Sequence, residues 1–182
     1  CRSREGLDIF ARHYETGEKI PEELFAKFEK SRKFMGANAA MRQLSFAQID
    51  LLLHTRTREF IDGGIEKTAR AALADFTHKY TEPVPTILPR FTHLFGDAVG
   101  YAAGYYSYKW AEVLEADAFT RFEREGLLNP EVGAEFAERI LRVGDTIDPA
   151  EAFRNFMGRD PDAAALVERS IAADVAEASG GK

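Results

Sequence analysis

Residues 129–161 read NPEVGAEFAERILRVGDTIDPAEAFRNFMGRDP, and this stretch shows most clearly that the chain is built from helices. Three times a capping side chain stands directly before a proline: Asn129-Pro130, Asp148-Pro149 and Asp160-Pro161. A polar cap followed by proline is favoured at the start of a helix. Gly144 and Gly158 stand where helices commonly end. The pattern predicts helices at 130–142, 149–157 and 161–177.

The helical period continues toward the N-terminus, where apolar residues recur at intervals of three and four. Leu7, Phe10 and Tyr14 predict one face of a first helix. A second helix follows Pro21, with a buried stripe of Leu24, Phe25 and Phe28 that Gly36 and Asn38 interrupt. A long third helix runs from Met41 to Thr55, and a fourth helical stretch follows Gly63-Gly64. The predicted fold class is all-α.

One segment breaks this pattern. Residues 82–90 contain three prolines and cannot form a regular helix. Its apolar residues Val84, Ile87 and Leu88 predict that it packs against the rest of the chain. We therefore interpret 1–182 as a single helical segment with a proline-rich connector at 82–90.

Composition restricts the classes of partner. The chain has 24 Lys and Arg against 30 Asp and Glu among its 182 residues, a net charge of −6. An acidic balance argues against nucleic acid and against an anionic membrane surface as partners. No apolar run reaches the roughly 18–20 residues of a membrane span. The single cysteine, Cys1, allows no internal disulfide, which favours a reducing compartment, the cytoplasm.

No metal site is predicted within this chain. Its four histidines, His13, His54, His78 and His93, never pair at the spacing that puts two imidazoles on one helical face. No H-E-x-x-H, P-loop, dinucleotide glycine fingerprint or G-x-S-x-G motif is present. Asp50 and His54, four residues apart, are expected to form an architectural pair.

The densest group of functional side chains lies at 93–110, HLFGDAVGYAAGYYSYKW. Tyr101, Tyr105 and Tyr108 have the spacing of one helical face, and the glycines Gly96, Gly100 and Gly104 precede or interleave with them. Two interpretations are open. The rings could be aromatic core, or the phenols could form a row of hydrogen-bond donors suited to an oxyanion in acyl transfer.

This segment resembles the C-terminal part of the thimet oligopeptidase and peptidyl-dipeptidase family of zinc metallopeptidases. Four further segments match the family in order: HYETGE (13–18), RQL (42–44), AEVLEADAF (111–119) and FMGRDP (156–161). The YAAGYYSY string (101–108) is closer to bacterial dipeptidyl carboxypeptidase and oligopeptidase A than to the animal enzymes.

The resemblance implies a mostly helical fold with a deep substrate channel and zinc as the cofactor of the full-length parent. It places the H-E-x-x-H helix N-terminal to the matched region, so we expect this chain to be the C-terminal segment of a longer enzyme and to be inactive alone. It also implies roles for the 93–110 segment: Tyr108 and His93 as catalytic residues, with Tyr101, Tyr105, Gly96, Gly100 and Gly104 binding substrate.

The leading hypothesis is therefore a part of a zinc oligopeptidase or peptidyl-dipeptidase that binds short peptides and stabilises the transition state. The alternative is a free-standing helical module that binds peptides or proteins without catalysis. The expected partners are short peptide substrates and the missing N-terminal part of the same polypeptide. Apolar surface left uncovered would favour self-association of the isolated chain.

Overall fold

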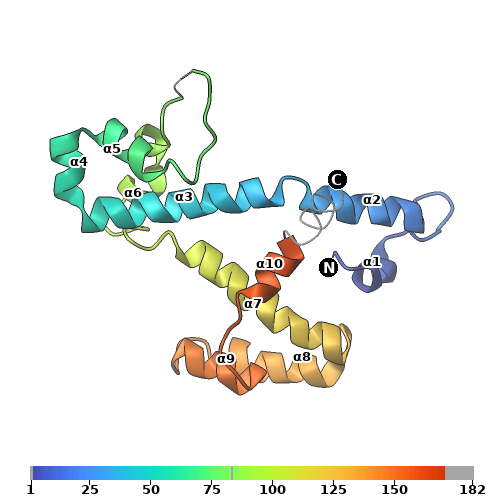
Figure 1. The fold of residues 1–182 in the computed structure, drawn as a ribbon. Coiled ribbons are helices and arrows are strands. Elements are labelled where there is room, and N and C mark those ends of the chain that lie inside the picture. Colours follow the sequence, from blue (N-terminus) through green and yellow to red (C-terminus); the bar gives the residue numbers. More distant parts are fainter. Residues whose placement is uncertain (1, 83, 171–182) are drawn as a thin grey trace, which may run out of the picture. The chain divides into compact units, whose positions relative to one another are not determined.

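The computed structural model describes residues 2–82 and 84–170, and every regular element within these ranges is helical (Figure 1). The predicted all-α class is confirmed. The helices are α1 (Arg4–Phe10), α2 (Glu22–Lys33), α3 (Gly36–Thr55), α4 (Thr57–Gly63), α5 (Ile65–Ala72), α6 (Thr92–Phe95), α7 (Ser107–Glu125), α8 (Pro130–Phe136), α9 (Pro149–Met157) and α10 (Ala164–Ser170), with a 3₁₀ turn, η1 (Leu88–Arg90), and a π-helical turn, η2 (Ala137–Leu141). In the described part of the chain, no helix has the length and apolar character required to span a membrane.

The proline-capped starts of α8 and α9 lie where the sequence predicts them. The Asn129 side chain accepts a hydrogen bond from the Glu131 N–H, and the Asp148 side chain accepts from Ala150 and Glu151. The predicted helix at 130–142 is α8 continued by η2. The helix α9 ends at Gly158, whose φ of +76° is the left-handed conformation that glycine adopts without strain.

The third predicted start is wrong. The helix α10 begins at Ala164, because the Asp162 side chain accepts from the Ala164 N–H at 2.9 Å while Asp160 is engaged with the Arg154 guanidinium. Residues 171–177 of the predicted helix lie outside the described residues.

Two predictions near the N-terminus also need correction. The helix α1 ends at Phe10, and Tyr14 lies in a turn where His13 Nδ1 accepts from the Glu15 and Thr16 N–H groups. The break after α2 falls at Met35, whose φ is +58°, so Gly36 opens α3 rather than interrupting a helix.

The apolar stripe predicted on α2 is not buried. The side chains of Leu24 and Phe28 are 56% and 38% exposed. Helical spacing identifies an apolar face, but the described residues do not cover this one.

The chain divides into two compact units, residues 1–36 with 112–182 and residues 37–111. In the first unit, the second half of α7, α8, η2 and α9 surround an apolar cluster. Its buried members are Ala118, Val132, Phe153 and Phe156, with Leu114, Phe122, Phe136, Ile140 and Met157 packed around them.

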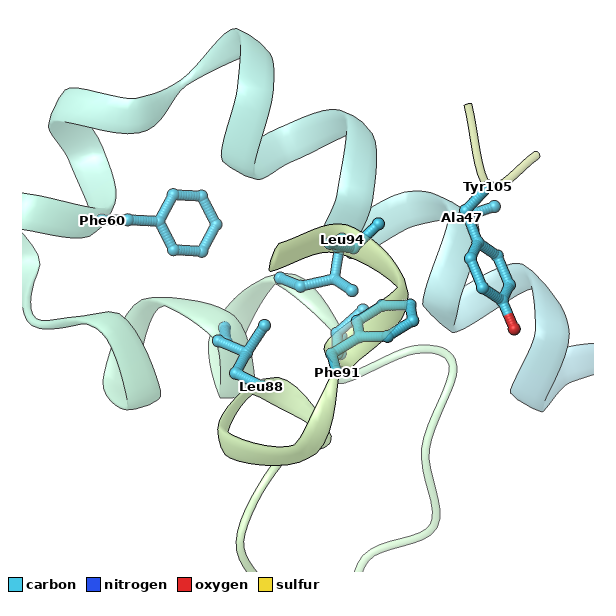
Figure 2. Close-up of a cluster of buried hydrophobic side chains, with 9 residues drawn as sticks. Ala47, Phe60, Leu88, Phe91, Leu94 and Tyr105 are labelled. Atoms are coloured by element: carbon cyan, nitrogen blue, oxygen red, sulfur yellow. The ribbon is translucent and has the colours of Figure 1, made fainter. Parts of the chain in front are cut away.

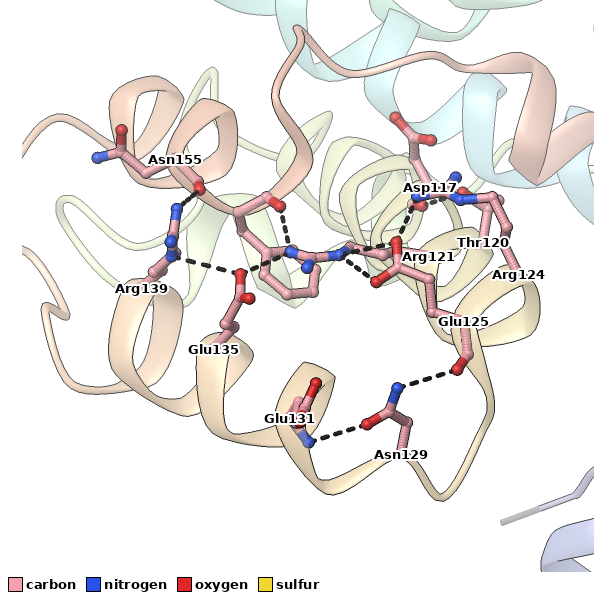
Figure 3. Close-up of polar contacts among 11 residues, drawn as sticks. Asp117, Thr120, Arg121, Arg124, Glu125, Asn129, Glu131, Glu135, Arg139 and Asn155 are labelled. Atoms are coloured by element: carbon pink, nitrogen blue, oxygen red, sulfur yellow. Dashed lines mark hydrogen bonds and ion pairs between the residues drawn. The ribbon is translucent and has the colours of Figure 1, made fainter.

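Two arginines link this cluster to polar groups, and Figure 3 shows the contacts of one of them, Arg121. Arg121 donates from Nη1 to the Phe156 carbonyl at 2.6 Å and to Glu135 at 3.0 Å, and its guanidinium lies over the Phe156 ring. Arg159 donates from both Nη atoms to Asp117, whose side chain is 1% exposed. These bonds hold the segment after α9 against α7.

The second unit is built around the C-terminal half of α3, where α4, α5 and α6 gather (Figure 1). Its buried cluster consists of Ala47, Ile49, Phe60, Ala69, Leu73, Leu88, Phe91, Leu94 and Tyr105 (Figure 2). The predicted packing of the connector is confirmed for Leu88 and Ile87, which join this core, whereas Val84 is 47% exposed. The single-segment organisation of 1–182 stays a prediction.

Candidate functional site

The 93–110 segment is a short helix, a turn-rich stretch and the start of α7. The helix α6 covers Thr92–Phe95, and α7 begins only at Ser107. Tyr101 and Tyr105 thus precede the helix, which corrects the prediction that they share a helical face with Tyr108. The physical reason is in the backbone: Gly100 and Ala103 have positive φ values of +34° and +55°, which an α-helix does not accommodate.

The rings nevertheless gather into one group, the tyrosine cluster, formed by His93, Tyr101, Tyr105 and Tyr108. The Tyr101 and Tyr108 rings are stacked with centroids 5.3 Å apart, and the Tyr105 centroid is 5.0 Å from that of Tyr108. His93 contacts Tyr101 and Tyr105 at 5.6 and 5.8 Å. The structure therefore brings together all four side chains that the sequence singled out.

Burial divides the cluster into a fixed part and an accessible part. Tyr105 is 7% exposed and packs edge-on against Phe46 and Phe91. In Figure 2 it lies at one end of the apolar cluster, with its hydroxyl directed away from Phe91 and Leu94. Tyr101 and Tyr108 are 42% and 38% exposed. The aromatic-core interpretation thus holds for Tyr105, whereas Tyr101 and Tyr108 are exposed and the donor interpretation of these two phenols stays a prediction.

The hydroxyl of Tyr108 is held in its neutral, proton-bearing form. Its hydrogen bond with Tyr101, followed by partial desolvation and the neighbouring phenols, raises the pKa of Tyr108 to about 12. Burial also raises the pKa of Tyr105, an effect that the nearby Arg42 opposes. At neutral pH these groups are therefore donors as well as acceptors.

The predicted glycines differ in what they do. A Cβ on Gly96 would lie 2.7 Å from the Thr92 carbonyl oxygen, too close for any side chain. Gly100 has a positive φ, and its N–H donates to Asp97 Oδ1 together with the N–H of Val99. These two bonds lower the pKa of Asp97. A Cβ on Gly104 would meet nothing closer than 3.5 Å.

Sequence reasoning underestimated one residue, Asp50 on α3. Its carboxylate is fully buried and accepts from the Ala103 N–H at Oδ1 and the Tyr105 N–H at Oδ2, each at 2.8 Å. The expected Asp50–His54 pair is confirmed, with Nδ1 3.0 Å from Oδ1. The i, i+4 spacing predicted that pair, but no local signal could link Asp50 to residues more than fifty positions away.

Among residues 2–82 and 84–170, no three His, Cys, Asp or Glu side chains gather where they could hold a metal ion. The described residues thus do not fit a zinc site.

The sequence of the chain matches a known protein family. The family model of peptidase family M3 matches residues 1–171. The chain belongs to peptidase family M3. The match includes the whole tyrosine cluster and the Asp50 pair.

The chain is also similar to individual oligopeptidases and carboxypeptidases. Oligopeptidase A of Escherichia coli K12 is 42% identical over 171 residues, covering 92% of this chain and 24% of the relative. The organellar oligopeptidase A of Arabidopsis thaliana is 42% identical over 173 residues, covering 88% and 21%. Dipeptidyl carboxypeptidase of E. coli K12 is 33% identical over 158 residues, covering 84% and 22%. The chain thus spans about a fifth to a quarter of the length of these relatives.

Proposed function

We propose that this M3 chain is the C-terminal part of a zinc-dependent oligopeptidase or peptidyl-dipeptidase that hydrolyses short peptides. Its contribution would be substrate binding and stabilisation of the transition state. The observation that carries the proposal is the tyrosine cluster, in which two accessible phenols, Tyr101 and Tyr108, stack on each other beside the exposed His93.

The chemistry follows from what a phenol can do. Attack of water on a peptide carbonyl carbon moves negative charge onto the carbonyl oxygen. A positioned O–H that donates to this oxygen stabilises the transition state more than the ground state. Tyr108 suits this role, because a phenol keeps its proton at neutral pH and the Tyr108 side chain is 38% exposed.

The other cluster members would position the peptide. Tyr101 and His93 are exposed and their ring centroids lie 5.6 Å apart, so the hydrogen-bonding groups of both could contact the peptide backbone. Tyr105 supports them from the core and turns its hydroxyl toward the Gln43 side chain at 3.5 Å. Gly96 and Gly100 would allow the backbone to turn tightly beside the peptide, with Gly104 as a further proposed contact from the same segment.

Zinc belongs to the proposal only for the full-length parent. The described residues offer no ligand set for it, so the proposed role of this chain is limited to hydrogen bonding and positioning. The cytoplasm remains the proposed compartment, because the one cysteine leaves the chain without an internal disulfide.

A segment exchange tests the proposal. The 171 residues of E. coli oligopeptidase A that align with this chain would be replaced by this sequence. We expect the folded chimera to hydrolyse the short peptides that the unmodified enzyme hydrolyses. A chimera that melts at the temperature of the unmodified enzyme and binds peptides, yet leaves them uncut, would instead support the non-catalytic binding module.

A further inference from the structure

The turn at Ala103–Tyr105, which lies between the members of the tyrosine cluster, is hydrogen-bonded to α3 through the buried side chain of Asp50. The carboxylate of Asp50 is 0% exposed, and each of its two oxygens accepts a separate backbone N–H from the turn. Oδ1 takes the Ala103 N–H and Oδ2 takes the Tyr105 N–H. The intervening Gly104 N–H donates to the Tyr101 carbonyl instead. Without this carboxylate, the N–H groups of Ala103 and Tyr105 would lack these acceptors, so Asp50 completes the hydrogen bonding of the turn.

The backbone within this turn needs that support. Ala103 has a φ of +55°, a conformation that costs a non-glycine residue free energy and persists where surrounding contacts impose it. Its N–H is one of the two groups that Asp50 holds. A charge-assisted hydrogen bond to a fully buried carboxylate is a contact strong enough to impose such a conformation.

A third donor fixes Asp50 itself. His54 Nδ1 lies 3.0 Å from Asp50 Oδ1 and 2.8 Å from the Asp50 carbonyl oxygen. Both neighbours are acceptors, so Nδ1 carries a proton and donates it to them. The His54 ring also stacks on Phe95, which immediately precedes Gly96. Asp50 and His54 thus contact the 93–105 segment near both of its ends.

We propose that Asp50 is the positioning residue of the site: its carboxylate sets the conformation of the Ala103–Tyr105 turn and so the orientation of the Tyr101 and Tyr108 phenols. Asp50 itself is fully buried, so it would act through the turn rather than by contact with substrate. The consequence for catalysis rests on the proposed function, whereas the consequence for ring geometry does not.

The test is Asp50→Asn in the full-length protein that carries this sequence. Asparagine keeps one accepting oxygen and places an NH₂ group where the second oxygen stood, so one of the two N–H donors loses its acceptor. We expect kcat to fall by about 10- to 100-fold with a much smaller change in KM, as misplacement of catalytic groups produces. In protein labelled with fluorotyrosine, the ¹⁹F resonances that Tyr101→Phe and Tyr108→Phe identify should shift.

Asp117→Asn is the matched control. Asp117 is also a buried carboxylate with both oxygens engaged, by Arg159 and the Asp162 N–H, but it lies outside the tyrosine cluster. We expect this variant to lower the melting temperature and to leave kcat and the two ¹⁹F resonances unchanged well below that temperature. An equal loss of kcat in both variants would mean that general destabilisation explains the effect, and would overturn the proposal.

A second variant covers the case in which Asp50→Asn fails to fold. His54→Ala removes one donor from Asp50 at a position where the side chain is 30% exposed. We expect the ¹⁹F resonances of the cluster to move in this variant as well. Unchanged resonances in whichever variant folds would overturn the inference. Full activity in Tyr108→Phe together with shifted resonances in Asp50→Asn would refute the proposed catalytic role alone.

Discussion

The Tyr101 side chain is the largest cause of the raised pKa of Tyr108, and the two rings are stacked with centroids 5.3 Å apart. A carbonyl oxygen gaining charge would compete with Tyr101 for the same proton. In the proposed role, stacking on Tyr101 would orient the Tyr108 donor before substrate arrives, and preorganised donors of this kind accelerate reactions.

A pair of glycine substitutions tests the backbone beside these rings. Gly96→Ala should lower the free energy of unfolding by about 1–3 kcal/mol, because the new Cβ would lie 2.7 Å from the Thr92 carbonyl oxygen. Gly104→Ala should change it by about 0.5 kcal/mol or less, since its nearest contact would be 3.5 Å away. Urea unfolding of the two variants measures both. Equal stability would contradict the close approach at Gly96.

Among the elements, the helix starts were the most predictable features. Asn129 and Asp148 each stand before a proline and cap helices in the structure as the sequence indicates. Asp160 has the same sequence signature but pairs with Arg154, and Asp162 caps α10 instead. Local sequence identifies a residue able to cap, and tertiary contacts decide whether it does so.

The turn at Ala103–Tyr105 shows where sequence reasoning stops. The spacing of Tyr101, Tyr105 and Tyr108 fits a helix, yet Asp50 takes the N–H groups that a helix would use internally. Hydrogen bonds to a residue more than fifty positions away thus override the helical pattern of the local sequence. The turn still brings the rings of the four candidate residues together, and their role in a site stays a prediction.

The ion pair between α7 and the segment after α9 gives a pH-dependent prediction. Hydrogen bonds from Arg159 are the main cause that lowers the pKa of Asp117 below its ordinary 3.8. Arg159→Met leaves a buried carboxylate without its main partner, and because the Arg159 side chain is 45% exposed the free energy of unfolding should fall by about 1–3 kcal/mol at neutral pH. The Asp117 contribution is present above the unfolded-state pKa and is lost as pH falls through the lower folded-state value.

The stability difference between wild type and Arg159→Met should therefore shrink at pH values below 3.8. Denaturant unfolding at neutral and acidic pH measures this trend. A difference that stays constant through the acid range would show that Asp117 is not the group responsible.

At the scale of the whole molecule, the isolated chain should neither retain zinc nor cleave peptides. The reason is that residues 2–82 and 84–170 contain no cluster of three metal-ligating side chains. Elemental analysis after dialysis, paired with a peptide hydrolysis assay, provides the measurement. One tightly held zinc per chain would contradict the expectation.

Exposed apolar side chains predict that the isolated chain self-associates. Phe10, Leu24 and Phe34 are 62%, 56% and 78% exposed, and exposed apolar patches commonly mark surfaces that bind another surface. Sedimentation should show a mass that rises with concentration, and Phe34→Glu should weaken this rise. A constant monomer mass over a wide concentration range would count against the prediction.

The central claim is that Tyr108 donates to the oxyanion, and the most direct measurement is kcat of Tyr108→Phe beside Tyr106→Phe in the full-length protein. Removing one transition-state donor should lower kcat by roughly 10²–10³, or about 2.7–4 kcal/mol, with little change in KM. Tyr106 is 51% exposed and lies outside the tyrosine cluster, so Tyr106→Phe should keep wild-type kcat. Equal kcat in wild type and Tyr108→Phe would contradict the claim.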